Sequence, residues 1–115
     1  MDLRKLPFSS TREVGQLLFL SGQIGLQEGR LVTGGIWEET KQAISNVSLV
    51  LEKKGLALSN VVDVTVFLVE QGDYAAFNKA YSSAFPSPYP TRTCVTVKSL
   101  PFGACVELKV IARLY

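Results

Sequence analysis

Apolar residues recur at every second position in several short stretches of the chain. This alternation is typical of strands that bury one face. The stretch 61–69 is also rich in β-branched side chains, which favours a central strand. We therefore predict strands at 12–14, 17–20, 31–32, 61–69, 92–98 and 104–114.

A first amphipathic helix is predicted at 37–54, where apolar residues are spaced three and four positions apart. Glu38 and Glu39 in its first turn, and Lys53 and Lys54 in its last turn, suit the helix dipole. Its expected buried face consists of Trp37, Thr40, Ile44, Val47 and Leu51.

A second helix is predicted to begin after Asp73, a favourable N-cap residue. Prolines at 86, 88 and 90 end it in an extended connector, because proline cannot continue a helix. We interpret Tyr74 and Tyr81 as core residues of this helix. Its apolar face comprises Tyr74, Phe77, Tyr81 and Phe85.

The order of these elements predicts one α+β domain over residues 1–115, a mostly antiparallel sheet with both helices on one face. In the last strand the face toward the helices is continuous and apolar: Ala104, Val106, Leu108, Val110 and Ala112. The opposite face is mixed: Cys105, Glu107, Lys109, Ile111 and Arg113. A partly apolar open face favours packing against another subunit.

The composition limits the class of protein that this chain can be. The chain has 47% hydrophobic and 19% charged residues, which suits a folded domain. No apolar run reaches the roughly 18 residues of a membrane helix, and residues 1–6 show no secretory signal. Two cysteines are too few for a disulfide scaffold, so we expect reduced thiols and a cytoplasmic protein.

The charged residues and the missing histidines exclude several function classes. A net charge of +2 without a basic run does not suggest nucleic-acid binding. The absence of histidine excludes Ser-His and Cys-His catalytic pairs and His-ligated metals, and no cofactor or metal is expected. Chemistry must therefore rest on other side chains, on backbone groups or on water.

The strand 92–98 carries the first candidate residues. Alternation predicts Thr93, Val95 and Val97 on the core face, with Arg92 and Cys94 together on the other. Arginine suits recognition of a carboxylate or phosphate, although an ordinary surface role explains Arg92 better when the residue is considered alone. Without a histidine partner, Cys94 is better explained as a small packed thiol than as a nucleophile.

Glu107 is unusual in the middle of an otherwise apolar strand. It could pair with Lys109 or Arg92, or act as a general base on water. If strands 92–98 and 104–114 formed a hairpin, Arg92 and Glu107 would share the face away from the helices.

Two further features are weaker signals. Asn78 could face solvent or cap a loop, and the turn Ser21-Gly22-Gln23 could offer backbone N–H groups to an anion.

Several stretches together resemble the RidA/YjgF family of small enamine/imine deaminases. The specific part is Arg92-Thr93-Cys94-Val95, followed by Leu100-Pro101 and Glu107. The matching stretches occur in family order and cover nearly the whole chain: 18–24, Gln42-Ala43 with Asn46, 64–68, 77–81 and 90–108.

The resemblance implies a chorismate-mutase-like fold and a homotrimer, with a central barrel and small-molecule clefts between subunits. It implies hydrolysis of reactive 2-imino or enamine acids to 2-keto acids and ammonia, as in 2-iminobutanoate/2-iminopropanoate deaminases. Neither a membrane nor nucleic acid is an expected partner. By position, Arg92 would anchor the carboxylate and Glu107 would orient water, and the residues expected to line the cleft are Cys94, Asn78, Ser21, Gly22 and Phe8.

Two departures from the family pattern bear on substrate range and rate. Phe8 stands in Pro7-Phe8-Ser9, where the family commonly has a cleft tyrosine, and the connector before Arg92 is short. The alternatives are a non-catalytic trimer that binds small carboxylates such as 2-keto acids, and an RNA-cleaving translation inhibitor.

Overall fold

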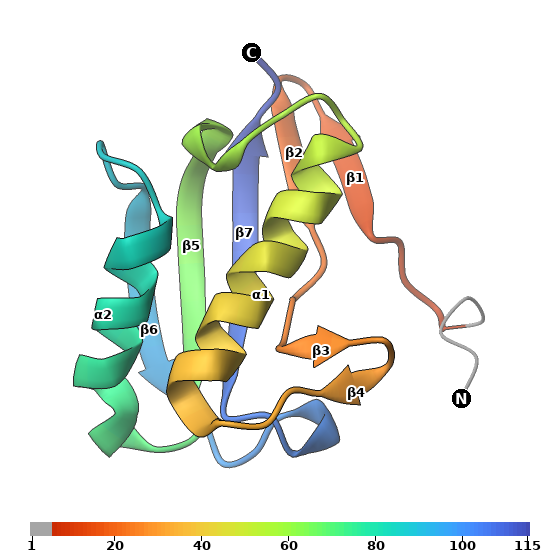
Figure 1. The fold of residues 1–115 in the computed structure, drawn as a ribbon. Coiled ribbons are helices and arrows are strands. Elements are labelled where there is room, and N and C mark those ends of the chain that lie inside the picture. The colour runs from red at the N-terminus through yellow and green to blue at the C-terminus, as the bar shows by residue number, and fades with distance from the viewer. Residues whose placement is uncertain (1–5) are drawn as a thin grey trace.

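A five-stranded sheet forms the centre of the molecule, in the order β1-β2-β7-β5-β6. The computed structural model describes residues 6–115, so the predicted lack of a signal at residues 1–5 lies outside the described residues. Both helices cover one face of the sheet (Figure 1), which confirms the predicted α+β architecture. The strands of this sheet are β1 (Thr11–Val14), β2 (Leu17–Leu20), β5 (Val61–Leu68), β6 (Thr91–Thr96) and β7 (Val106–Arg113).

The strand pairing is antiparallel except at one edge. β1 pairs with β2, β2 with β7 and β7 with β5 in antiparallel fashion, whereas β6 runs parallel to β5. A parallel neighbour requires a crossover, which α2 (Tyr74–Ala84) supplies. Because β5 lies between β6 and β7, the hairpin considered for 92–98 and 104–114 does not form.

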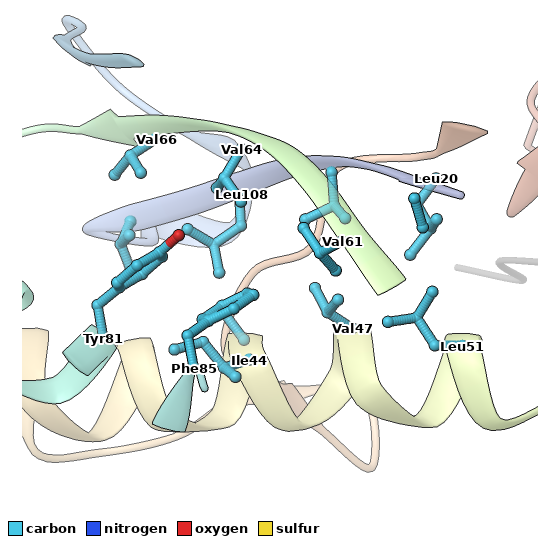
Figure 2. Packing of buried hydrophobic residues seen from close by; sticks show 14 of the residues in the cluster. Leu20, Ile44, Val47, Leu51, Val61, Val64, Val66, Tyr81, Phe85 and Leu108 are labelled. Atoms are coloured by element: carbon cyan, nitrogen blue, oxygen red, sulfur yellow. The ribbon is translucent and has the colours of Figure 1, made fainter. Parts of the chain in front are cut away.

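The core lies between the sheet and the helices. Figure 2 shows Ile44, Val47 and Leu51 directed from α1 (Gly35–Glu52) toward side chains of the sheet. The predicted apolar face of the last strand is confirmed, since Val106, Leu108 and Val110 are at most 1% exposed. Each such fully buried aliphatic side chain contributes about 1.5–3 kcal/mol relative to exposure.

Several predicted boundaries were wrong by one or two residues. α1 ends at Glu52, so Lys53 and Lys54 follow the helix and do not occupy its last turn. Asp73 does occupy the N-cap of α2, but its side chain makes no capping hydrogen bond. The predicted edge strand is β4 (Arg30–Leu31), which pairs with β3 (Leu26–Gln27).

The predicted core face of the strand 92–98 was also wrong. Cys94 packs against the core, while Val95 is 41% exposed on the opposite face. The parallel register explains the reversal, because Cys94 lies beside the fully buried Val66 and Val95 lies beside Phe67. Alternation gave the two faces correctly, but the neighbouring strand decides which face is buried.

Two leucines of α1 provide a matched test of this packing. Leu51 is 0% exposed and Leu49 is 52% exposed. Leu51→Ala is expected to lower the free energy of unfolding by about 2–5 kcal/mol through lost burial and a residual cavity. Leu49→Ala is expected to change it by less than about 1 kcal/mol. Urea unfolding of both variants at one protein concentration measures the difference, and equal losses would contradict the packing described.

Candidate active site

Arg92 lies on the helix-covered side of β6, against the aromatic face of α2. Its guanidinium carbon Cζ is 4.9 Å from the ring centroid of Tyr81 and 5.4 Å from that of Phe77. Its Nη2 donates a hydrogen bond of 3.2 Å to the hydroxyl of Tyr74. Within residues 6–115, no carboxylate forms an ion pair with this guanidinium. The cation is therefore held in place by aromatic rings and keeps N–H groups for an anion.

Two hollows border the Arg92 side chain. The first has a volume of about 500 Å³ and is lined by Leu68, Gln71, Tyr74, Arg92, Cys94 and Thr96. The second has a volume of about 270 Å³ and is lined by Asn78, Tyr81, Ser82, Tyr89, Pro90 and Arg92. The structure thus brings together three residues singled out in the sequence: Arg92, Cys94 and Asn78.

Cys94 is poorly suited to nucleophilic attack. Burial raises the pKa of its thiol, and the opposing effect of Arg92 is smaller. A thiol with a raised pKa stays protonated near neutral pH, and the thiolate is the reactive form. Cys94 therefore lines the first hollow beside Arg92 as a neutral, packed thiol.

Two buried polar atoms beside Arg92 have no hydrogen-bond partner: Asn78 Oδ1 and the Tyr81 hydroxyl. Burial is the main cause that raises the pKa of Tyr81 to about 12, so its phenol stays neutral. Buried polar groups are nearly always paired, so these two unpaired atoms form an unsatisfied polar spot among the side chains that line the second hollow.

Sequence reasoning missed two of the tyrosines around Arg92. Tyr74 was interpreted as core, but it is 46% exposed and contacts Arg92, because it is the first residue of α2. Tyr81 does belong to the core, yet the residue also lines the second hollow. The spacing of Tyr74, Asn78 and Tyr81, four and three positions apart, places all three on one helix face and could have revealed the cluster.

Glu107 lies on the opposite side of the sheet. It pairs with Phe67 of β5, whereas Arg92 pairs with the buried Val64 of the same strand. Cross-strand partners point to the same face, and residues 64 and 67 point to opposite faces. The possibility that Arg92 and Glu107 share the face away from the helices is therefore wrong.

The loop after β2 lies directly against the Glu107 carboxylate. A Cβ added to Gly22 would come within 1.9 Å of Glu107 Oε2, so only glycine leaves room for the carboxylate in this position. Gln23 holds the loop in place, because its backbone exchanges hydrogen bonds with Leu108 at 2.8 and 2.9 Å. The close approach of Gly22 follows from this bridge.

The loop is also fixed from the helix side. The Asn46 amide donates hydrogen bonds to the carbonyls of Ile24 and Leu26, at 3.0 and 2.9 Å. The buried Glu39 accepts a hydrogen bond of 2.9 Å from the backbone N–H of Cys105, two residues before Glu107. Burial, followed by Glu39, raises the pKa of the Cys105 thiol to about 12, so this cysteine is unreactive as well.

Glu107 borders a cleft of about 600 Å³, lined by Leu6, Phe8, Ser21, Gly22, Gln23, Ile24, Leu26, Pro101, Phe102 and Glu107. Phe8, Ser21 and Gly22, expected to line the site, lie here and not beside Arg92. Burial raises the pKa of the Glu107 carboxyl above its ordinary value, which makes it a stronger base than an exposed glutamate.

The expected site residues therefore form two separate groups within one chain. The Arg92 group contains Arg92, Cys94 and Asn78, and the Glu107 group contains Phe8, Ser21, Gly22 and Glu107. In the part of the chain that the structure describes, no three His, Cys, Asp or Glu side chains gather in a way that could hold a metal ion. No helix of residues 6–115 is long and apolar enough to cross a membrane.

Comparison with known proteins identifies relatives over nearly the whole chain. The sequence model described as Endoribonuclease L-PSP matches residues 4–114. A goat (Capra hircus) protein named 2-iminobutanoate/2-iminopropanoate deaminase is 39% identical over 92% of this chain and 79% of its own length. The mitochondrial protein mmf1 of Schizosaccharomyces pombe is 34% identical over 92% of this chain and 67% of its own.

Solved structures agree with this assignment. The RidA structure from an Antarctic Psychrobacter is 30% identical, with a TM-score of 0.90 over 95% of this chain and 89% of its own. A Thermotoga maritima structure described as a putative endoribonuclease is 36% identical, with a TM-score of 0.89 over 95% of this chain and 87% of its own. Sequence and fold agree along the full domain, and the chain belongs to the RidA/YjgF family, the family of the Endoribonuclease L-PSP model.

Proposed function

We propose that this protein hydrolyses reactive 2-imino acids, and the enamines that tautomerise to them, to 2-keto acids and ammonia. The observation that carries the proposal is the pair of groups on either side of the sheet. One presents a guanidinium without a carboxylate partner among the described residues, and the other presents a partly buried carboxylate whose pKa burial raises. An imino acid needs both a cation for its carboxylate and a base for the attacking water.

Arg92 binds the substrate carboxylate through its guanidinium N–H groups. Asn78 and Tyr81 line the hollow beside the guanidinium, in which the rest of the substrate would lie. The rings around Arg92 fix the guanidinium without neutralising it, which favours a planar two-pronged contact.

Glu107 activates water on the other side of the substrate. Its carboxylate takes a proton from water while the oxygen bonds to the imine carbon and the C=N electron pair moves to nitrogen. The nitrogen takes up the proton held by Glu107 and then the proton of the new hydroxyl group, which becomes C=O as the C–N bond breaks, so ammonia is released and the 2-keto acid remains. The reaction needs no covalent enzyme intermediate, so positioning and one activated water supply the acceleration.

The two groups meet only if copies of the chain assemble. Within one chain the sheet separates them, and its open face carries Phe67 beside Glu107 and the exposed Val95 on the far side of Phe67. We propose a homotrimer in which the Arg92 group of one subunit faces the Glu107 group of its neighbour. Exposed apolar residues on a sheet face are consistent with such packing.

The name of the family model supports one second candidate, RNA cleavage. The chain carries a net charge of +2 and no histidine, which disfavours both tight RNA binding and histidine-based cleavage. Tight, salt-sensitive RNA binding would favour this candidate over imine hydrolysis.

The direct test couples the protein to a PLP-dependent dehydratase that makes 2-aminoacrylate and measures keto-acid release above the spontaneous rate. Arg92→Ala is expected to lower kcat/KM by roughly 10²-fold through lost charge-assisted hydrogen bonds. The kcat/KM of Arg92→Lys should lie between those of the wild type and Arg92→Ala, since lysine keeps the positive charge but cannot make the two-pronged hydrogen bond of a guanidinium. Arg30→Ala is the matched control, because Arg30 is exposed on β4.

Imine hydrolysis is refuted if the wild type gives no acceleration, or if Arg92→Ala equals the wild type. Calorimetric binding of a 2-keto acid that requires Arg92, without turnover, would select the non-catalytic carboxylate-binding trimer.

The pH dependence tests the role of Glu107. The active form is the carboxylate, and burial raises its pKa. We therefore expect kcat/KM to fall as pH drops through this raised pKa and to level off above it. Glu107→Gln should remove this acid limb and lower kcat by roughly 10²–10⁴-fold. The control is Glu52→Gln, because Glu52 is exposed; this variant should keep the acid limb of the pH profile and the wild-type kcat. An unchanged pH profile in Glu107→Gln would exclude Glu107 as the base.

Light scattering tests the assembly. The wild type is expected at three times the chain mass of 12.6 kDa. Val95→Asp places a charge on the open sheet face and should lower both the mass and the activity. Leu49→Asp, on an exposed position of α1, should leave the mass unchanged. A monomeric, fully active wild type would contradict the assembly.

A further inference from the structure

The cleft beside Glu107 is lined mainly by apolar side chains. Among the described residues that line the cleft, Glu107 is the one charged side chain, and no lysine or arginine lines it. The polar contributions come from the turn residues Ser21, Gly22 and Gln23. Such walls can solvate an uncharged hydrocarbon group far better than a second carboxylate or an ammonium group.

Phe102, which lines this cleft, has an unfavourable backbone conformation. It adopts φ 63° inside the short turn Pro101–Gly103, a left-handed conformation that side chains with a Cβ rarely adopt. Its ring is nonetheless 50% exposed, so burial in the described chain does not account for it. The turn directs a large aromatic ring to the cleft that contains Glu107.

Phe8 supplies a second ring to the same cleft. It is 63% exposed, and the segment that carries it is attached to the site loop, because Ser21 Oγ donates a hydrogen bond to the Ser9 carbonyl. Two half-exposed rings, those of Phe8 and Phe102, thus line one cleft together with the Ser21-Gly22 turn and Glu107.

We infer that the preferred substrates carry a bulky apolar side chain, branched or aromatic, which binds between the rings of Phe8 and Phe102. This inference rests on the proposed imine hydrolysis and names its substrate class. With the carboxylate on Arg92 and the imine carbon near Glu107, the remaining substituent of the substrate points into the apolar cleft. A methyl substituent would leave both rings in water, whereas a larger group removes them from it.

A panel of imines tests the preference. A D-amino acid oxidase with catalase converts D-alanine, D-leucine, D-asparagine and D-phenylalanine to their imines, in which C2 is planar. Hydrolysis by the wild type is measured as ammonia release above the spontaneous rate. We expect kcat/KM for the leucine-derived imine to exceed that for the alanine-derived imine by about tenfold or more, the low end of discrimination by an apolar pocket.

The asparagine-derived imine separates shape from polarity, because its side chain is nearly isosteric with that of leucine. We expect it to be hydrolysed at least about tenfold less efficiently than the leucine-derived imine, since the rings of Phe8 and Phe102 offer its amide no hydrogen-bond partner.

Substitutions in the cleft test which aromatic ring causes the preference for larger apolar side chains. Phe102→Ala is expected to bring the leucine-to-alanine ratio of kcat/KM close to one, and Phe8→Ala to lower it. Trp37→Ala is the matched control: this aromatic residue is 39% exposed on α1, away from the cleft, and its loss should leave the ratio unchanged.

The outcomes distinguish the inference from the function on which it rests. Equal or better hydrolysis of the alanine-derived imine would overturn the inference and leave imine hydrolysis standing. No hydrolysis of any imine would overturn both. If Phe102→Ala changes the mass in light scattering but not the ratio, the ring packs against a neighbouring subunit and the inference is wrong.

Discussion

The alternation of side chains across the central sheet is the constraint on which the account depends. The parallel register of β6 on β5 places Arg92 and Cys94 on the face of Val64 and Val66. The antiparallel register of β7 on β5 places Glu107 on the face of Phe67. A sheet cannot be crossed by a small substrate, so the proposed reaction requires the cation and the base to come from different copies of the chain.

Each group is prepared by elements other than its own strand. The aromatic rings of α2 hold the Arg92 guanidinium while leaving N–H groups free for a ligand, and desolvation keeps the Tyr81 phenol neutral. Across the sheet, Asn46 and the Gln23 bridge fix the loop whose Gly22 leaves room for Glu107. The helices therefore position both groups, although they cover only one face of the sheet (Figure 1).

Much of this fold could be predicted from the sequence, because period-two and period-3.6 patterns depend on local geometry. The buried face of β7 and the packed side of α1 follow from them directly, except that Trp37, expected on this side of α1, is 39% exposed. Strand order could not be predicted, since it depends on which distant strand pairs with β6. The interpretation of Val95 as core, and of Arg92 and Glu107 on one face, failed for that reason. Tyr74 was misplaced because its exposure depends on where α2 begins relative to the sheet.

Complementation between two inactive variants tests the shared site most directly. Arg92→Ala and Glu107→Gln chains, refolded together in equal amounts, form mixed trimers in which some sites combine an intact Arg92 with an intact Glu107 of the neighbour. The account predicts recovery of roughly a quarter of wild-type imine hydrolysis, the random frequency of such sites. Mixed trimers without any recovered activity would show that each site is built within one chain and would contradict the account.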